Sequence, residues 1–547
     1  MARPRVRAGH LLSHAGLNLL SKATIFLGSY LAFLVQPLVA RATLPILGGT
    51  SAVWVTCLAA FQALLVAGYW YAHGLGKSVR RGSGASESCG VRLPRCHLVL
   101  LLLAAGWLAA MSAGFGRLSA WLGGIFPHPA LGAFSAAAFL AGPVYVLLAA
   151  NATLVQSLAG GAYRLYSVSN LGSLAGLFAH PLVLEPFVPV RMQWLVLSVG
   201  TLAYAVLLGW CGRCAAGGTS VIPVADKMPT PPGTARMAAS HPVLYLALPA
   251  AGCFLLNAAT AHVTENVAPL PLLWAVFLGG YLLSWAIGFS ARGERLLPLW
   301  AVLGVLAALG CAFMRGRAPL TVGRMAAGLA SALALVVFAC SALHAWLCRI
   351  RPSGSRLSRY NLALALGGAI GGALSGIVAP LAFDSVLEWP LALVLAAGLL
   401  LTCLWRQTEG IVRRWLPNRV PLVRNVLLAL FVVVAFATGR GEWTARRDDL
   451  ARGRSFYGTW RVYYDTLRNR YGKEVPAYCF EHGGTLHGLE AVDRIYRDEG
   501  TTYYGTEGGG LAFSLHSGYA AGRPVRAGLV GESLADDGVD GVGEEEP

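Results

Sequence analysis

Acidic residues are scarce over most of this 547-residue sequence. Only eight of the 26 Asp and Glu residues precede residue 439, and charged residues make up 13% of the chain, about half the share usual in soluble proteins. Lysine is rare as well, since 39 of the 43 basic residues are arginine. The first 438 residues are therefore not a soluble fold, and we expect them to lie in lipid.

The net charge of +17 is divided unevenly. Residues 1–438 carry 30 Lys and Arg against eight acids, whereas residues 439–547 carry 13 against 18. The basic residues lie between apolar runs and not on one soluble face, which argues against nucleic acid as a partner. Their placement is typical of signals that orient membrane helices in a lipid bilayer. The acidic tail, in contrast, is expected to be in water.

The eleven cysteines do not indicate a metal or redox site. Most lie in or beside apolar runs, where cysteine usually acts as a small hydrophobe. Cys211 and Cys214 form one CxxC, without the second pair or thioredoxin-like context that such chemistry requires. We therefore expect no metal ligands. The basic arm at residues 1–22 leads into a full-length span without a cleavage motif, so no cleavable signal peptide is expected.

Apolar runs long enough to cross a bilayer recur thirteen times. They lie near 23–42, 52–72, 97–116, 131–151, 165–184, 193–211, 243–263, 270–290, 297–314, 324–347, 361–382, 390–405 and 421–438. The loop 212–241, rich in Gly, Pro, Ser and Thr, separates a first bundle (23–211, about six spans) from a second (242–438, six or seven). The sequence thus predicts an all-α polytopic membrane bundle with a major-facilitator-like 6+6 layout.

Loop charges predict the orientation of the bundle in the cell membrane. With the N-terminus inside, the inner loops hold most of the basic residues, although three arginines in an outer loop oppose the trend (Arg315, Arg317 and Arg324). The positive-inside rule therefore places the N-terminus in the cytoplasm. Thirteen spans would put the tail outside and twelve would put it inside, and the sequence leaves that choice open.

Two kinds of feature inside the spans favour specific packing or binding. Gly367 lies over Gly371 and Gly368 over Gly372 on a helix, which predicts a close helix–helix seam. Ten polar residues in or beside the spans are candidate site residues, because polar groups are costly in hydrocarbon: Gln36, Arg41, Gln62, Asn170, His180, Glu185, His262, Glu265, Asn266 and His344. They would either form a pocket for a small cation or polar metabolite, or join helices by hydrogen bonds and caps.

The best cluster among these candidates is that of His262, Glu265 and Asn266, which share one helical face. Prolines interrupt the fifth span at His180-Pro181 and Glu185-Pro186. Such breaks free backbone carbonyls that can line a cavity. The cluster itself is expected near a membrane boundary.

The tail at 439–531 is rich in aromatic and β-branched residues with Gly-rich turns, which predicts a small β-rich domain. The final residues, 532–547, are expected to be disordered. His482 and His487 are five residues apart, so we expect them on opposite faces of a strand, which argues against a metal pair. His487, Glu490, Tyr503 and Tyr504 are candidates to hold an alkylammonium group by cation–π and charge contacts, the alternative being ordinary packing.

Several stretches together resemble a family of fused major-facilitator and spermidine-synthase-like membrane proteins. The stretches are LVQPLVARATLPILGGTSAVWVTCLAAFQALLVAGYWYAH from Leu34, YRLYSVSNLGSLAGLFAHPLVLEP from Tyr163, HVTENVAPLPLLW from His262, and 366–390. In the tail, Ser455 to Gly458 and 482–490 are similar to the first synthase blocks. The sequence departs from the family pattern at Asn266 (family Asp), Trp346 (family Glu) and Glu490 (family Gln).

The resemblance implies that a Rossmann-like domain for decarboxylated S-adenosylmethionine should follow. Residues 523–531 are similar to its first strand, but the last sixteen residues, ESLADDGVDGVGEEEP, lack the expected Gly-x-Gly turn and are too few for a βαβ unit. We therefore expect a C-terminally truncated, spermidine-synthase-like protein with no bound cofactor, no catalytic residues and no aminopropyltransferase activity. The alternatives are a transporter or exporter of a polyamine or other small polar metabolite, and a membrane scaffold without a ligand.

Overall fold

The structure is a computed structural model that describes most of the helical region and four strands. The described residues are 14–47, 51–82, 93, 95–125, 129–158, 165–216, 242–266, 271–314, 321–352, 357–455, 458–468 and 473–493. The chain divides into two compact units, Met1–Arg461 and Val462–Pro547. The first five residues of the predicted linker, 212–216, belong to helix α8 (Val190–Ala216), so the helix ends later than predicted, whereas 217–241 and the predicted disordered end at 532–547 lie outside the described residues.

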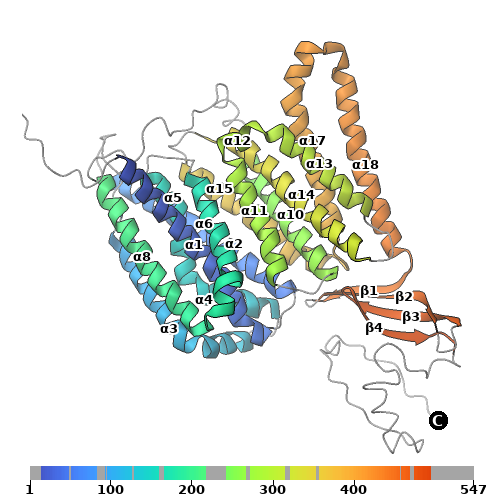
Figure 1. Cartoon of the computed structure of the whole chain (residues 1–547), viewed down its shortest axis with the longest axis horizontal. Coiled ribbons are helices and arrows are strands. Elements are labelled where there is room, and N and C mark those ends of the chain that lie inside the picture. Colours follow the sequence, from blue (N-terminus) through green and yellow to red (C-terminus); the bar gives the residue numbers. More distant parts are fainter. Residues whose placement is uncertain are drawn as a thin grey trace, which may run out of the picture. The chain divides into compact units, whose positions relative to one another are not determined.

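All thirteen apolar runs form helices (Figure 1). The first six correspond to α1 (His14–Leu47), α2 (Ser51–Gly82), α3 (Arg95–Ile125), α4 (Pro129–Ala149), α6 (Leu165–Ala179) and α8 (Val190–Ala216). The next seven correspond to α10 (Leu244–Asn266), α11 (Pro271–Gly288), α13 (Leu297–Met314), α14 (Val322–Arg349), α15 (Leu357–Ala373), α17 (Glu388–Trp415) and α18 (Val420–Arg446). Within the described ranges, twelve helical spans are long and apolar enough to cross a membrane, and α11 is a shorter apolar helix. The chain is thus a multi-pass membrane protein.

Shorter helical pieces complete the bundle. They are α5 (Asn151–Leu158), α7 (Glu185–Phe187), α12 (Ala291–Arg295), α16 (Ala379–Ala382), the 3₁₀ turn η5 (Pro417–Arg419), and two π-helical turns, η1 (His180–Leu184) and η4 (Leu374–Val378). Each π-helical turn extends the fifth long helix of its half, which is α6 in the first half and α15 in the second. Such turns contain a wider backbone ring and commonly mark functional places in a helix.

The two halves of the bundle repeat one packing pattern. In the first half α1 packs on α6, α2 on α4, and α3 on both α4 and α8. In the second half α10 packs on α15, α11 on α14, and α13 on both α14 and α17. When the helices of each half are numbered in order, each of these contacts has a counterpart in the other half. This repeated arrangement of six helices and six helices confirms the predicted 6+6 layout.

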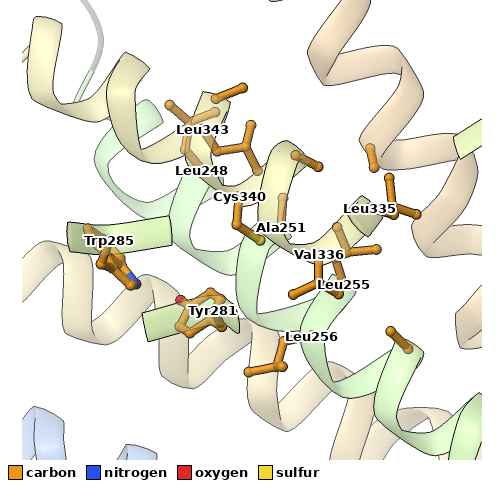
Figure 2. Packing of buried hydrophobic residues seen from close by; sticks show 14 of the residues in the cluster. Leu248, Ala251, Leu255, Leu256, Tyr281, Trp285, Leu335, Val336, Cys340 and Leu343 are labelled. Atoms are coloured by element: carbon orange, nitrogen blue, oxygen red, sulfur yellow. The ribbon is translucent and has the colours of Figure 1, made fainter. Parts of the chain in front are cut away.

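Each half has its own apolar core. One buried cluster runs through the first half, from Leu20 to Cys214, and the other mainly through the second half, from Leu248 to Leu404. Figure 2 shows part of the second core, where Leu255 of α10, Tyr281 of α11 and Val336 of α14 lie close together. The two clusters also reach across the junction, since the second includes Trp54 and Leu177 of the first half and the first includes Ala365 of the second half.

A glycine seam joins the first and fifth helices of each half. A Cβ on Gly176 would lie 2.1 Å from the carbonyl oxygen of Tyr30, and a Cβ on Gly371 would lie 2.1 Å from that of Ala250. Gly172 and Gly367 lie about one turn earlier, and a Cβ on either would lie 2.4 Å from a backbone oxygen of α1 or α10, respectively. The seam predicted around Gly367 and Gly371 is therefore confirmed, and a matching one exists in the first half.

The halves meet through two helix pairs, α2 with α15 and α6 with α11. The Ser167 hydroxyl of α6 donates to the carbonyl oxygen of Ala286 in α11 over 3.2 Å. On the other side of the junction, His73 Nδ1 of α2 is 2.9 Å from the hydroxyl of Ser358 in α15. Asn361 of α15 adds two more hydrogen bonds between the halves, donating to Thr153 and Gln156 of α5 over 3.3 Å and 3.1 Å.

The thirteenth long helix stands apart from the repeat. α18 returns beside α17 (Figure 1) and packs on α17 and α13. Only 6% of its most apolar stretch is buried, and Leu428, Val432 and Phe436 are exposed, as expected for a helix that faces lipid. Both α17 and α18 extend beyond the short spans expected from the sequence.

The strands β1 (Asp449–Ser455), β2 (Gly458–Arg468), β3 (Glu474–His482) and β4 (Thr485–Ala491) form one sheet in chain order. β3 pairs antiparallel with β4, with an irregularity between Phe480 and Glu481. Gly483, with φ 62°, makes the turn between them. The expectation that His482 and His487 occupy opposite faces of one strand is wrong, because this turn separates them and brings their ring centroids to 5.8 Å.

Candidate functional site

A pocket lies at the junction of the halves, at the end of the bundle where α1 ends and α2 begins. Nine residues from α1, α2, α6 with its extension, and α11 line it: Pro37, Arg41, Trp54, Leu177, His180, Pro181, Glu185, Trp274 and Ala275. Three of the ten intramembrane candidates, Arg41, His180 and Glu185, therefore share one pocket. The sequence favoured the cluster on α10 instead.

Arg41 and Glu185 form an ion pair across the mouth of the pocket. Arg41 Nη1 lies 3.2 Å from Glu185 Oε1, and the two side chains are 49% and 28% exposed. The other Glu185 oxygen, Oε2, is 3.9 Å from His180 Nδ1. The π-helical turn carries His180 at its start, and Glu185 follows its end, so this turn sets the distance between the two side chains. Both charges remain accessible to a ligand.

Two indole rings close the junction beside this ion pair. Trp54 of the first half and Trp274 of the second are both buried, and their ring centroids are 5.1 Å apart. Neither Trp274 Nε1 nor His180 Nε2 finds a hydrogen-bond partner within the part of the chain that the structure describes. Buried polar groups normally have partners, so two polar atoms of pocket residues are left available to a bound molecule.

Four other predicted residues lie away from the pocket lining, and three of them (Gln36, Gln62 and His344) contact a neighbouring helix. Gln36 donates to the Tyr145 hydroxyl over 2.9 Å, and Asn170 donates to the Tyr166 carbonyl one turn earlier over 2.8 Å. Gln62 faces Gly368 across the α2–α15 contact. Buried His344 lies 3.0 Å from the Ser284 hydroxyl and stacks on Trp285, with 3.6 Å between ring centroids.

The cluster on α10 lies at the same end of the bundle as the pocket but not in its lining. His262 stacks on Trp389, the second residue of α17, with ring centroids 5.1 Å apart. Glu265 accepts a hydrogen bond from the Thr459 hydroxyl. Asn266 is the last residue of α10, and its side chain lies outside the described residues. The cluster thus lies at the C-terminal end of α10, and its position at a membrane boundary stays a prediction.

Sequence reasoning missed a buried ion pair at the start of α17. Glu388 is fully buried, and both of its oxygens accept from Arg454 of β1, over 2.9 Å and 3.0 Å. Arg454 also donates to the Ser385 carbonyl over 3.0 Å. The one available signal was that Glu388 is among the eight acids before residue 439. The pair fixes β1 to the end of the bundle at which α17 begins.

The tail candidates show packing contacts. His487 of β4 lies beside His482 and Phe480, and Glu490 pairs with Tyr478 in the register of β3 and β4. Tyr503 and Tyr504 lie outside the described residues. In the same unit, the Tyr464 hydroxyl donates to that of Tyr478 over 2.9 Å, and this hydrogen bond raises the pKa of Tyr464.

Metal ligands are a separate question. Within the described ranges, no group of three or more His, Cys, Asp or Glu side chains is arranged to hold a metal ion. Cys211 and Cys214 are both buried, and neither forms a disulfide. The chemistry that the pocket residues can supply is charge pairing, hydrogen bonding and aromatic contact.

Comparisons with known proteins give structural likeness only. No protein-family model matches the chain, and no curated protein is detectably similar in sequence. One similar solved structure is the major facilitator superfamily proton:xylose symporter XylE bound to 6-bromo-6-deoxy-D-glucose, with 13% identity, TM-score 0.44, and coverage of 79% of this chain and 95% of that one. Another is the nucleoside transporter NupG, with 11% identity, TM-score 0.39, and coverage of 71% and 98%.

At these values the two structures indicate neither substrate nor mechanism for this chain, and neither is a spermidine synthase. The class of protein rests on the helices themselves. The chain is an integral membrane protein of two six-helix repeats, with one additional helix and a small sheet.

Proposed function

We propose that this protein is a major-facilitator-like transporter that moves a small polar metabolite through the junction of its two halves. The observation that carries the proposal is the placement of the pocket. Its walls come from both halves, with Trp54 on one side and Trp274 on the other, and it contains an accessible ion pair. Ion pairs in a membrane domain commonly mark a substrate pathway.

The repeated packing supplies a physical route for alternating access. Each half is held together by its own core and its own glycine seam, whereas the halves meet along α2–α15 and α6–α11. Rocking of one repeat against the other would separate Trp54 from Trp274 and open the pocket at this end. The seams on α1 and α10 would remain closed throughout.

The other expectations from the sequence receive less support. The two named structural matches are transporters, and the described strands supply only a four-stranded sheet. A polyamine as cargo and a cytoplasmic N-terminus remain proposals, the second resting on the loop charges. Aminopropyl transfer would be shown by spermidine formed from putrescine and the aminopropyl donor, and we expect none.

Transport is tested with the purified full chain in proteoliposomes. Labelled putrescine, spermidine, xylose, uridine and a set of α-amino acids are supplied outside, with protein-free vesicles as blank. We expect uptake of at least one class, and a loss of most of it in Glu185→Gln. The matched control is Glu409→Gln, which removes a carboxylate from the exposed pair with Arg413, 2.6 Å apart on α17. Uptake equal in Glu185→Gln and the control would refute the role of this pocket.

A further inference from the structure

We infer that the pocket beside Arg41 recognises a small zwitterion, a molecule that carries an ammonium and a carboxylate close together, as an α-amino acid does. This inference rests on the proposed function and names its substrate class. The first observation is electrical balance. Arg41 and Glu185 contribute one charge of each sign at the mouth, so a ligand with one charge of each sign leaves no charge unpaired.

Each group of the ligand has a partner of matching chemistry. A carboxylate takes the guanidinium of Arg41 and the free indole N–H of Trp274, which is a donor only. An ammonium takes the Glu185 carboxylate and lies near the rings of Trp54 and Trp274, where a cation gains further attraction. His180 Nε2 is the remaining unpartnered polar atom among the described residues that line the pocket.

Ligands whose charges are all of one sign fit less well. A polyamine would meet Glu185 but would bring its positive charges against Arg41, and a dicarboxylate would have the opposite problem with Glu185. When a ligand with charges of one sign breaks the Arg41–Glu185 pair, one charged side chain of the protein is left without a partner, which is costly in a partly desolvated site. A neutral sugar would leave the pair intact and use the indoles and hydrogen bonds alone.

The pocket is narrow in this structure. The space between the lining residues accommodates about one water molecule. Arg41 and Glu185 hold each other in the positions that the two charges of a zwitterion would occupy. Binding therefore exchanges one ion pair for two, and it requires the Trp54–Trp274 contact to loosen.

The test is equilibrium binding of labelled α-amino acids to the full-length protein in nanodiscs. Competitors are the matching amine without a carboxylate, the matching acid without an amine, putrescine, xylose and uridine. We expect at least one amino acid to bind and both of its single-charge analogues to compete at least tenfold more weakly. Trp274→Phe keeps an aromatic ring and loses the N–H, so the affinities for the amino acid and for its acid analogue should fall several-fold, and the affinity for the amine should fall less.

Arg413→Gln is the control for loss of a surface arginine and should leave binding unchanged. The inference is overturned if no α-amino acid binds, if either single-charge analogue competes equally well, or if Trp274→Phe weakens both analogues alike. Uptake of xylose, uridine or putrescine that depends on Glu185 would support the proposed transport but refute a zwitterion as the substrate. Amino-acid binding without uptake of any of the labelled compounds would support the binding site but refute the proposed transport.

Discussion

The two halves of the bundle share a fold but differ at the start of their last repeat helix. Gln193-Trp194 near the start of α8 and Glu388-Trp389 at the start of α17 are 195 residues apart, the same interval that separates Gly176 from Gly371. All four of these helix-start side chains are buried. The indole is therefore common to both halves, whereas the polar residue before it is an amide in one and an acid in the other.

The difference follows from what each polar side chain bonds. Gln193 Nε2 donates to the carbonyl oxygens of Leu184 and Val188, over 3.3 Å and 2.8 Å, and so closes its own half. Glu388 accepts from Arg454, which belongs to the strand that follows the bundle. The first half is thus complete in itself, and the second depends on a residue from outside the repeat.

The largest effect is expected from Glu388→Gln. Arg454, 10% exposed, would keep its buried charge without a carboxylate, and breaking such a pair costs about 3–5 kcal/mol. The free energy of unfolding in mixed micelles should fall by that amount. Glu409→Gln, at an exposed pair, should change it by less than about 1 kcal/mol. The double change Glu388→Leu with Arg454→Leu should recover much of the loss, and equal melting of the first two variants would contradict the comparison.

The reverse exchange, Gln193→Glu, is expected to be the next most severe. A carboxylate there would face two carbonyl oxygens with no arginine beside it, so the half loses two hydrogen bonds and gains a buried charge. We expect destabilisation of about 3 kcal/mol. Gln193→Met removes only the bonds and should cost less. A Gln193→Glu protein as stable as the wild type would show that the two positions are interchangeable.

The glycine seams should respond alike in the two halves. Gly176→Ala and Gly371→Ala each place a methyl group 2.1 Å from a backbone oxygen of the neighbouring helix, and the helices must separate. We expect each to lower the free energy of unfolding by about 1–3 kcal/mol. Gly106→Ala on α3, where the new methyl meets nothing within 4 Å, is the control. A large effect in one half only would break the repeat.

The smallest effect concerns one hydrogen bond between the first and fifth helices of each half. The hydroxyls of Ser29 and Ser169 are 2.7 Å apart, and Asn257 donates to Ser375 over 3.0 Å. Hydrogen bonds between membrane helices contribute about 0.6 kcal/mol on average. Ser169→Ala and Ser375→Ala should therefore each shift the unfolding free energy by about that much, measured in the same micelles. Losses above about 2 kcal/mol would indicate a role beyond joining helices.

The length of the apolar runs predicted the helices well, because a helix needs about 20 apolar residues to cross the bilayer. Every apolar run that the sequence offered became a helix, including 421–438, despite Arg424 within it. The boundaries were less certain, since α17 and α18 continue into polar segments where lipid no longer selects residues. The sequence predicted two bundles, but it did not show which helices pack together within each, because those contacts join distant segments.

The site was less predictable because it depends on contacts between distant segments. Arg41 and Glu185 were both candidates, but no spacing rule pairs residues on α1 and α7. Trp54 and Trp274 look like ordinary apolar residues in sequence and become pocket walls only when the halves meet. His482 and His487 were wrongly placed because a period-2 rule was applied across a turn that Gly483 makes.

The helix without a counterpart in the repeat, α18, determines at which end of the bundle β1 begins. The last turn of α18 and the strand that bears Arg454 both reach the end of the bundle where α17 begins. An odd number of crossings brings the polypeptide out on the side opposite its first residues. If all thirteen long helices cross the bilayer, we therefore expect the start of α1 and β1 to face opposite compartments, and protease added to one face of a sealed vesicle should digest only one of them.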